Sequence, residues 1–270
     1  SNPSSACTAP KPTPALERGL YIESERMGYI LGALTQQSLD AQRGIVQNEK
    51  RQGDNQPYGL AFYRILEGLF PEGHPYRHST IGSMADLDDA SLEEVRQWFR
   101  DNYGPNNAVI VLAGDINAAE ARPLMERYFG QIPRGPENEP AAADVPTLSE
   151  RVDVTMQDRV SNTRLYRTWV VPGLSHEDLV ELNTAAQVLG GLDSSRLDRI
   201  LVRDEHTAVS VSPSVLPFQR VSMFFVTVDV KPGEDVDAVS RRLDEIIADF
   251  LANGPTTDEV QRVATQNVAA

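Results

Sequence analysis

The sequence has a single cysteine, no apolar run long enough to cross a bilayer, and no cluster of basic residues. Cys7 alone can form neither an internal disulfide nor a cysteine-based zinc cluster. A membrane-spanning helix needs about 20 consecutive apolar residues, and no segment approaches that length. The chain has 25 Lys and Arg against 39 Asp and Glu, and this net charge of -14 disfavours a nucleic-acid partner. What remains is an acidic chain of 270 residues, 40% of them hydrophobic, which is typical of a globular protein.

The first 15 residues differ in composition from the rest. The stretch SNPSSACTAPKPTP is rich in Pro, Ser and Thr, which predicts a disordered leader or a remnant of cloning over residues 1–15. It lacks the basic-then-apolar order of a signal peptide. The apolar segment that precedes a lipid-modified cysteine is also missing, so lipid attachment at Cys7 is a disfavoured alternative. The residues themselves leave the compartment open.

Amphipathic helices dominate the first part of the chain, residues 16–132. Apolar spacing predicts a helix across Leu39–Gln52. Ser91 and Glu94 have the spacing of a capping box, which predicts that another helix begins there. Only one strand is predicted, over Ala108–Asp115. Because a single strand cannot make a sheet, this first domain is predicted to be incomplete.

A segment rich in Pro, Ala and acidic residues, 133–150, is predicted to be a linker to a second domain, residues 151–270. The predicted strands of that domain are 151–157, 162–172, 207–216 and 219–230. A helix capped by Ser175 should lie between the two pairs of strands, and a long helix stopped by Gly254 should follow them. This order predicts an α+β fold, with helices packed on a mostly antiparallel sheet. The last helical pattern runs to the end of the sequence, which suggests a truncated domain.

One residue of the Leu39–Gln52 helix is unexpected. At about 100° per residue, Glu49 falls on the more apolar side of the helical wheel. Its neighbours there are Leu39, Gln42, Ile45 and Val46, and the opposite side carries Asp40, Arg43, Gln47, Lys50 and Arg51. A carboxylate facing a core costs several kcal/mol, on the order of an unpaired buried charge, unless a cation or donors meet it. Periodicity alone favours an Arg or backbone amides over a metal ion as that partner.

Other candidate sites have simpler interpretations. His74 and His78 have the i, i+4 spacing of a zinc pair, but Gly and Pro place them in a turn with no Glu between them, so we expect surface histidines of an ordered loop. His176 and His206 are next to acidic residues at helix ends, where capping or solvation is the default role. The segment GGLDSSRL, 190–197, lacks the Lys of a phosphate loop and is interpreted as a turn between helices.

A family resemblance runs from Leu16 to the C-terminus. The stretch IESERMGYILGALTQQSLDAQRGIVQNEKRQGDNQPYG resembles the helical pair that follows the active-site motif in the pitrilysin/insulysin family of zinc peptidases, which includes the mitochondrial processing peptidases. The likeness continues through GHPYRHSTIGSMADLDDASLEEVRQWFRDNYGPNNAVIVLAGDI and FGQIP, and then through VVPG, LGGLDSSRL and TTDEVQRVA.

The resemblance implies a role for Glu49. In that family, zinc is held by the two histidines of an inverted H-x-x-E-H motif and by a distal glutamate, while the motif's own glutamate activates water. The distal glutamate falls on Glu49. Gln42 stands where the family often has a second acidic residue that supports catalysis, and Val209 stands where it commonly has a tyrosine. H-x-x-E-H itself occurs nowhere in the sequence, so we expect this segment alone to bind zinc weakly and to be inactive.

The resemblance also implies an architecture and partners. In the family, paired domains enclose peptides or unfolded polypeptides in a chamber, so residues 151–270 would form a non-catalytic wall. The missing upstream segment, and a second half or partner subunit, would complete the site. The alternative is a scaffold or chaperone-like subunit that accompanies an active peptidase. Family analogy favours the bacterial periplasm or cell envelope.

Overall fold

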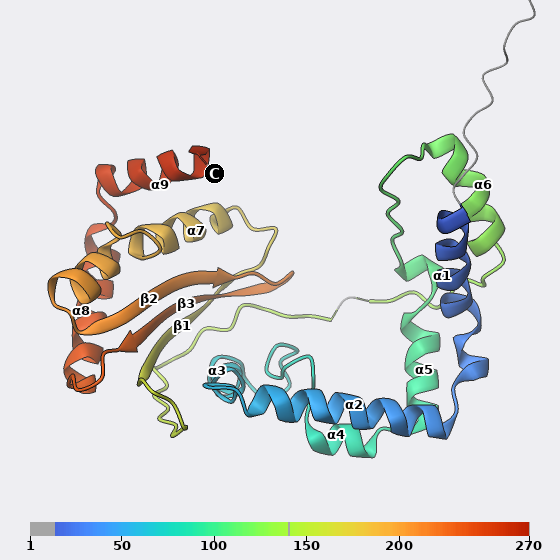
Figure 1. Ribbon diagram of the computed structural model, residues 1–270, viewed down its shortest axis with the longest axis horizontal. Coiled ribbons are helices and arrows are strands. Elements are labelled where there is room, and N and C mark those ends of the chain that lie inside the picture. Colours follow the sequence, from blue (N-terminus) through green and yellow to red (C-terminus); the bar gives the residue numbers. More distant parts are fainter. Residues whose placement is uncertain (1–13, 140, 270) are drawn as a thin grey trace, which may run out of the picture. The chain divides into compact units, whose positions relative to one another are not determined.

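The computed structural model describes residues 14–139 and 141–269, which fall into two compact units (Figure 1). The first unit comprises residues 1–51 and 81–140, and the second comprises residues 52–80 and 141–270. The expectations for residues 1–13, including those for Cys7, lie outside the described residues. No helix in the described ranges is both long and apolar enough to cross a membrane.

Helices make up the regular structure of the first unit. They are α1 (Pro14–Ala33), α2 (Gln36–Asp54, whose last three residues belong to the second unit), α4 (Met84–Asp89), α5 (Leu92–Asn102), the 3-10 turn η1 (Pro105–Asn107) and α6 (Ala118–Phe129). The predicted capping box is confirmed, because Ser91 accepts from the Glu94 amide and Glu94 bonds back to Ser91. Helices α1 and α6 pack together and bury Leu20 and Leu124. This pairing is the main apolar contact of the unit.

The strand predicted over Ala108–Asp115 is not formed. The segment is irregular, and the side chains of Val109 and Val111 are 92% and 81% exposed. The prediction was wrong because a β-strand exists only beside another strand, and the described part of the first unit contains none. The β-branched composition favours an extended backbone locally, but it does not indicate which segment could pair with that strand.

The second unit contains an antiparallel sheet with the order β1-β3-β2 (Figure 1). Its strands are β1 (Arg164–Pro172), β2 (Ala208–Leu216) and β3 (Val221–Val230). With its helices, this sheet confirms the predicted α+β class. The strand expected over residues 151–157 is again absent, because this stretch lies in an irregular segment without ladder pairing in the described structure.

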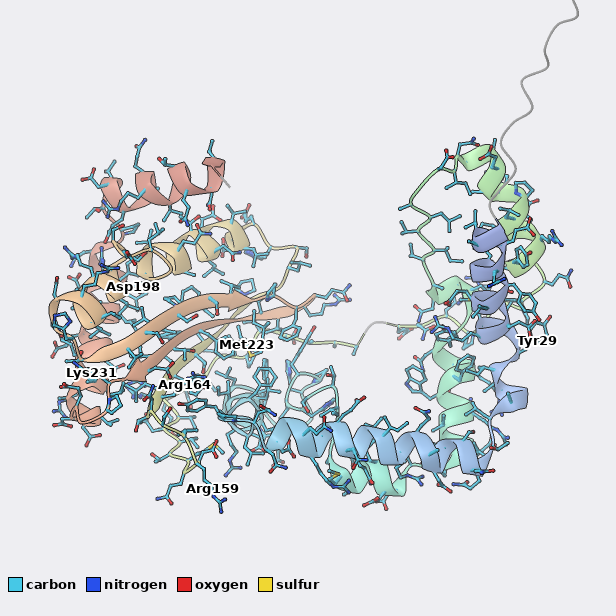
Figure 2. The ribbon with its side chains drawn as sticks, viewed as in Figure 1. Tyr29, Arg159, Arg164, Asp198, Met223 and Lys231 are labelled. Atoms are coloured by element: carbon cyan, nitrogen blue, oxygen red, sulfur yellow. The ribbon has the colours of Figure 1, made fainter. Side chains whose placement is uncertain are left out.

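The described part of the second unit also contains five helical segments. They are α3 (Ala61–Leu69), α7 (Asp178–Leu189), the π-helical turn η2 (Asp198–Asp204), α8 (Val236–Asn253) and α9 (Thr257–Ala269). Those of α3, α7 and α8 pack against the two faces of the central strand β3. Val226 and Val228 belong to one core with α7 and α8, whereas Met223 (Figure 2) packs with Leu66 and Leu69 of α3 in another. Since side chains alternate across a strand, β3 is buried on both sides at its start. The α3 segment therefore groups with the second unit, although the sequence placed it within 16–132.

Two predicted helix ends have different outcomes. Gly254 follows α8 with φ of 69°, a left-handed conformation that glycine adopts readily, so the predicted stop is confirmed. Ser175 is not the cap of α7, because the first flanking residue is Glu177, whose side chain makes no capping bond, and the Asp178 amide donates to Nδ1 of His176 at 3.3 Å. A capping signal fixes a helix start only when the side chain reaches the free amides, and here the turn at Gly173 displaces Ser175 from them.

Candidate functional site

Helix α2 carries Gln42 and Glu49, two of the three residues that the family resemblance singles out. The helix begins at Gln36, where the side chains of Thr35 and Ser38 each accept a hydrogen bond from the other's amide at 3.1 and 2.9 Å. This reciprocal pairing satisfies amides that have no partner within the first helical turn. The helix then runs without interruption past Gln42 and Glu49, so both side chains are held on one rigid element.

The carboxylate of Glu49 is exposed, and so is the amide of Gln42. Within the described structure, neither side chain forms a hydrogen bond or an ion pair, and α2 contains no buried residue. On the same side of the helical wheel, Ile45 is 49% exposed, whereas Leu39 and Val46 are half-buried. The idea that Glu49 pairs with an Arg or backbone amides inside the fold was wrong.

The opposite side of α2 makes the contacts. The guanidinium of Arg43 donates to the carbonyl of Leu87 at 2.7 Å and to that of Ala90 at 2.6 Å, and Gln47 donates to Asp88 at 2.6 Å. These acceptors lie at the last turn of α4 and just beyond it, where carbonyls have no partner within the helix. The helical wheel placed Arg43 on the side opposite Glu49. A wheel includes only the residues of one helix, so it cannot show acceptors that lie 44 and 47 residues away.

The described residues do not fit a zinc ion by themselves. Zinc in proteins takes three or four protein ligands, and no group of three His, Cys, Asp or Glu side chains converges anywhere in the described ranges. Glu49 is one carboxylate ligand, and H-x-x-E-H is absent from the sequence. The arrangement can therefore present one ligand to a metal that other residues hold.

The histidines have the structural roles that the sequence predicted. His74 accepts from the Tyr76 amide through Nδ1 at 3.1 Å, so its Nε2 carries the proton and donates to the carbonyl of Asp144 at 2.9 Å. Its ring also stacks on Phe70 with centroids 4.7 Å apart. His78 is exposed, and its Nδ1 lies 3.2 Å from the carbonyl of the adjacent residue. The pair therefore orders a loop.

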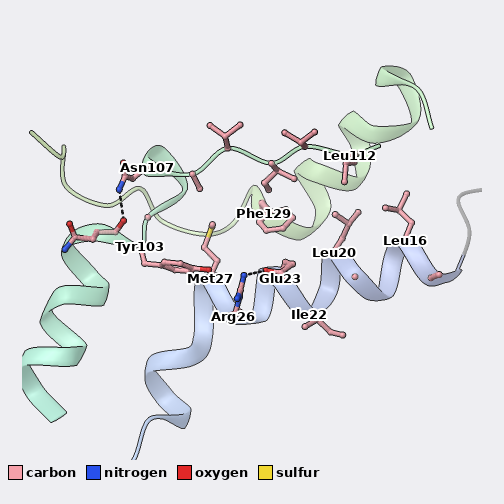
Figure 3. Close-up of a pocket in the computed structure, with 18 residues that line it drawn as sticks. Leu16, Leu20, Ile22, Glu23, Arg26, Met27, Tyr103, Asn107, Leu112 and Phe129 are labelled. Carbon is pink, nitrogen blue, oxygen red and sulfur yellow. Dashed lines mark hydrogen bonds and ion pairs between the residues drawn. The ribbon is translucent and has the colours of Figure 1, made fainter. Parts of the chain in front are cut away.

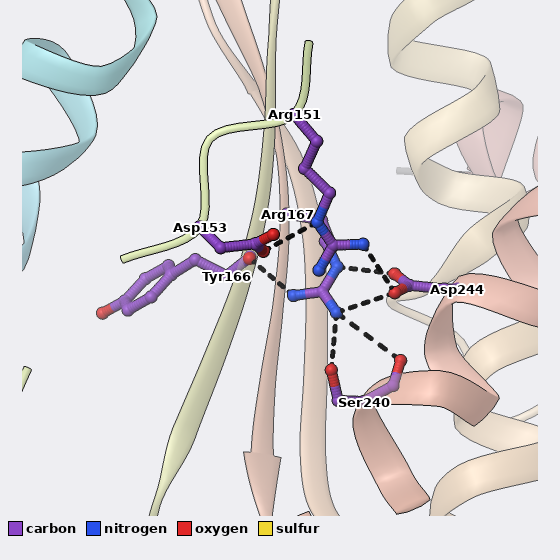
Figure 4. A network of polar contacts seen from close by, with 6 residues as sticks. All are labelled: Arg151, Asp153, Tyr166, Arg167, Ser240 and Asp244. Carbon is purple, nitrogen blue, oxygen red and sulfur yellow. Dashed lines mark hydrogen bonds and ion pairs between the residues drawn. The ribbon is translucent and has the colours of Figure 1, made fainter. Parts of the chain in front are cut away.

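A network of charges joins three segments of the second unit (Figure 4). Arg167 of β1 makes two contacts with Asp244 of α8, at 2.6 and 3.1 Å, and also reaches Ser240. Arg151 donates to Asp244 at 2.9 Å and to Asp153 at 2.7 Å. Burial raises the pKa of the Asp244 carboxyl, but the hydrogen bonds from Arg167 and Arg151 outweigh it, and the pKa lies below its usual value. The network anchors the 151–153 segment and has no free group for chemistry.

The segment 190–197 forms the predicted turn between helices. Ser195 donates to the carbonyl of Gln187 and accepts from the Leu192 amide, at 2.9 and 3.2 Å. Asp198 (Figure 2) accepts from the Gly191 amide, while its burial raises the pKa of this carboxyl above the usual value. Val209 is 51% exposed and lies at an irregularity in the pairing of β2 with β3, so it presents an apolar group where the family commonly has a phenol.

The model of the peptidase M16 inactive domain matches residues 89–267, most of the chain. The chain belongs to the peptidase M16 family. The resemblance to the pitrilysin-like zinc peptidases is thereby confirmed. The matched region includes the sheet of the second unit and lies entirely after Glu49. The family-level description is that of a hydrolase, and the region matched is the type described as inactive.

Named relatives agree with this assignment. Zinc protease PqqE of Helicobacter pylori is 24% identical over 255 residues, which is 92% of this chain and 56% of the relative. The crystal structure of a protease from Helicobacter pylori has the same fold, with a TM-score of 0.82 at 24% identity over 94% of this chain and 61% of that chain. The first half of the periplasmic protease PqqL from Escherichia coli has a TM-score of 0.73 at 19% identity, over 96% and 55% of the two chains. This chain thus spans 55–61% of the length of these three chains, the last of which is itself only the first half of a protease.

Proposed function

We propose that this chain is part of a zinc-dependent metallopeptidase, in which Glu49 supplies one metal ligand and residues 151–270 form a non-catalytic domain. The observation that supports the proposal is the state of Glu49. Its carboxylate is exposed and without an ion pair in the described structure, on a helix whose opposite side is anchored through Arg43. A ligand needs this combination of a fixed backbone and a free carboxylate.

The remaining zinc ligands would come from sequence outside these 270 residues, as H-x-x-E-H in the same polypeptide or from a partner subunit. The similar PqqL structure is described as the first half of a periplasmic protease, which supports a partner half and an envelope location for this chain as well. Peptides or unfolded polypeptides enclosed between the halves are the proposed substrates. By itself, the present segment is expected to be inactive.

A second candidate is a scaffold or chaperone-like subunit of an active peptidase. Gln42 favours it, because an amide stands where the family often has an acidic residue. The sequence of the gene upstream of the codon for Leu16 separates the two functions. H-x-x-E-H encoded there supports the peptidase, and other residues at those positions support the scaffold.

The experiment that tests Glu49 is a Glu49→Gln variant of the protein that includes the upstream residues. Zinc content by mass spectrometry and cleavage of a fluorogenic peptide should both be lost. Glu25→Gln is the matched control, because Glu25 is also an exposed helical glutamate of the first unit, and this variant should retain both. Full zinc content and activity in Glu49→Gln would show that the assignment of Glu49 is wrong.

A further inference from the structure

The sequence contains one Asn-Gly pair, Asn253-Gly254, and it lies at the end of α8. Asparagine deamidates spontaneously when the backbone nitrogen of the next residue attacks the carbon of the side-chain amide. Glycine at that next position hinders the attack least, because it has no side chain. Asn253 is exposed, so water can reach it, and an added Cβ at Gly254 would meet nothing within 4 Å. The pair therefore has the composition and the access of a deamidation site.

Two hydrogen bonds at the end of α8 engage both reacting groups. The Gly254 amide donates to the carbonyl of Phe250 at 2.9 Å, and Nδ2 of Asn253 donates to Asp249 at 2.7 Å. The attacking nitrogen must give up its proton, and the side-chain amide must turn toward that nitrogen, so the reaction requires both bonds to open. The carbonyl of Gly254 is also fixed, because Nη2 of Arg196 donates to it at 3.2 Å. The folded junction thus holds the pair in an unreactive arrangement.

We propose that Asn253 is a deamidation site that the last hydrogen bonds of α8 keep closed in the folded chain. When the end of α8 opens, the nitrogen of Gly254 forms a bond to Cγ of Asn253 and the bond between Cγ and Nδ2 breaks. The leaving nitrogen departs as ammonia with the proton of the Gly254 amide, and a succinimide ring remains. Water then opens this ring at either of its carbonyls, which gives aspartate or isoaspartate.

Both products weaken the junction at which they form. A carboxylate at position 253 adds a negative charge one turn from Asp249, at the C-terminal end of a helix, where the helix dipole disfavours an anion. Isoaspartate also inserts a methylene into the backbone directly before Gly254, whose carbonyl accepts from Arg196. Arg196 pairs with Glu259 at the same junction. Each deamidation therefore leaves a junction that opens more readily than before.

Asn102 is a matched site within the same chain. It is the last residue of α5, and its Nδ2 donates to the carbonyl of Trp98 at 2.9 Å. The next amide, that of Tyr103, donates to the carbonyl of Phe99 at 2.9 Å. Asn102 and Asn253 thus have the same kinds of hydrogen bond, but Asn102 is followed by a tyrosine, whose ring lines an apolar groove (Figure 3). In the unfolded chain, Asn102 should therefore deamidate more slowly than Asn253.

Peptide mapping by mass spectrometry measures deamidation at each asparagine, and an isoaspartyl methyltransferase assay identifies the isoaspartate. In guanidinium chloride, Asn253 should react before Asn102 and before every other asparagine of the chain. In the folded chain, at the same pH and temperature, Asn253 should react at least about tenfold more slowly, because only the locally opened fraction is competent. The proposal is wrong if Asn253 has no advantage over Asn102 in guanidinium chloride, or if it reacts equally fast in the folded and unfolded chains.

Two variants of exposed acidic residues on α8 test the closure itself. Asp249→Ala removes the acceptor of the Asn253 side chain and should speed deamidation of the folded chain by about two- to tenfold, which corresponds to the loss of one hydrogen bond. Glu245→Ala is the matched control, because Glu245 lies one turn earlier and pairs with Arg242, and this variant should react as the parent does. The two side chains are 59% and 65% exposed, and urea unfolding checks that both variants stay folded. Equal deamidation rates in the two variants would overturn the proposed closure.

Discussion

Arg196 and Glu259 form a two-bond ion pair in the second unit, with Nε to Oε1 at 3.0 Å and Nη2 to Oε2 at 2.8 Å. The two side chains are only 9% and 11% exposed. Glu259 also accepts from the Thr256 amide at the start of α9, and Arg196 reaches the carbonyl of Gly254 at the end of α8. The pair thus fixes the junction of the last two helices to the turn after α7. Its hydrogen bonds lower the pKa of the Glu259 carboxyl from 4.5 to about 2.

This shift predicts how stability depends on pH. Because the folded-state pKa of Glu259 is depressed, its stabilising contribution is fully present above pH 4.5 and is lost as the pH falls toward 2. A shift of this size corresponds to about 3 kcal/mol at neutral pH. Glu259→Gln should therefore lower the free energy of unfolding by about that amount at pH 7, and the difference from the parent should shrink below pH 4.5. Urea unfolding at several pH values measures this difference.

The control for this prediction is Glu205→Gln. Glu205 pairs with Arg242, but these side chains are 34% and 42% exposed. A solvent-exposed pair contributes about 0–1 kcal/mol, so the effect should be small at every pH. A Glu259→Gln penalty as small as that of Glu205→Gln would show that the buried pair does not stabilise the junction. The variants are best compared in a Trp98→Phe background. Trp169 of β1 is then the one remaining tryptophan, so its fluorescence follows the unfolding of the second unit.

Arg43 is expected to stabilise the first unit through α4. Its planar guanidinium serves the carbonyls of both Leu87 and Ala90, and an ammonium cannot reproduce this fork. Arg43→Lys should cost about 1–3 kcal/mol, the range for hydrogen bonds from a charged group, and should speed amide exchange in α4. Arg51→Lys is the control, since Arg51 is exposed and bonds only to Asn48 in the described structure. If the amides of α4 exchange at the same rate in the Arg43→Lys and Arg51→Lys variants, Arg43 does not anchor α2 to α4.

Local signals in the sequence predicted local structure well. The Ser91 capping box and the Gly254 stop are confirmed because each acts within a few residues of its own position. The strand over Ala108–Asp115 failed because its ladder requires a partner that sequence periodicity cannot provide. For the same reason, the helical wheel of α2 did not predict the contact of Arg43, since that contact is with distant backbone. The position of Glu49 as a ligand candidate came only from the family resemblance.

Glycine substitutions should separate close packing from helix propensity. An added Cβ at Gly190 would lie 2.2 Å from Cδ of Pro213, although the φ of −159° at Gly190 suits any residue. Gly190→Ala should therefore destabilise the second unit by about 2–3 kcal/mol through this collision.

An added Cβ at Gly44, within α2, would meet nothing within 4 Å. Gly44→Ala should stabilise the first unit by about 0.5–1 kcal/mol, because alanine favours a helix. Chemical unfolding followed by Trp169 or Trp98 measures each unit, and similar effects of the two variants would refute the collision.

Tyr58 combines an unfavourable backbone with favourable side-chain contacts, so its substitutions have a predicted order. Its φ is 61°, its hydroxyl donates to the carbonyl of Asn162 at 2.7 Å, and its ring lies 3.8 Å from the Arg164 guanidinium (Figure 2 labels Arg164). Arg164 is held in turn by Asp229, at 2.7 and 3.0 Å.

Tyr58→Phe removes only the hydroxyl bond and should cost about 1 kcal/mol of unfolding free energy. Tyr58→Gly loses the cation–π contact as well but relieves the left-handed backbone, so its cost should be about 1–2 kcal/mol. Tyr58→Ala loses the same contacts without that relief and should be the most destabilising, by about 1 kcal/mol more than glycine. Urea unfolding in the Trp98→Phe background provides the comparison. An alanine variant as stable as the glycine variant would mean that the backbone at residue 58 relaxes out of the left-handed region once the ring no longer holds it against Arg164.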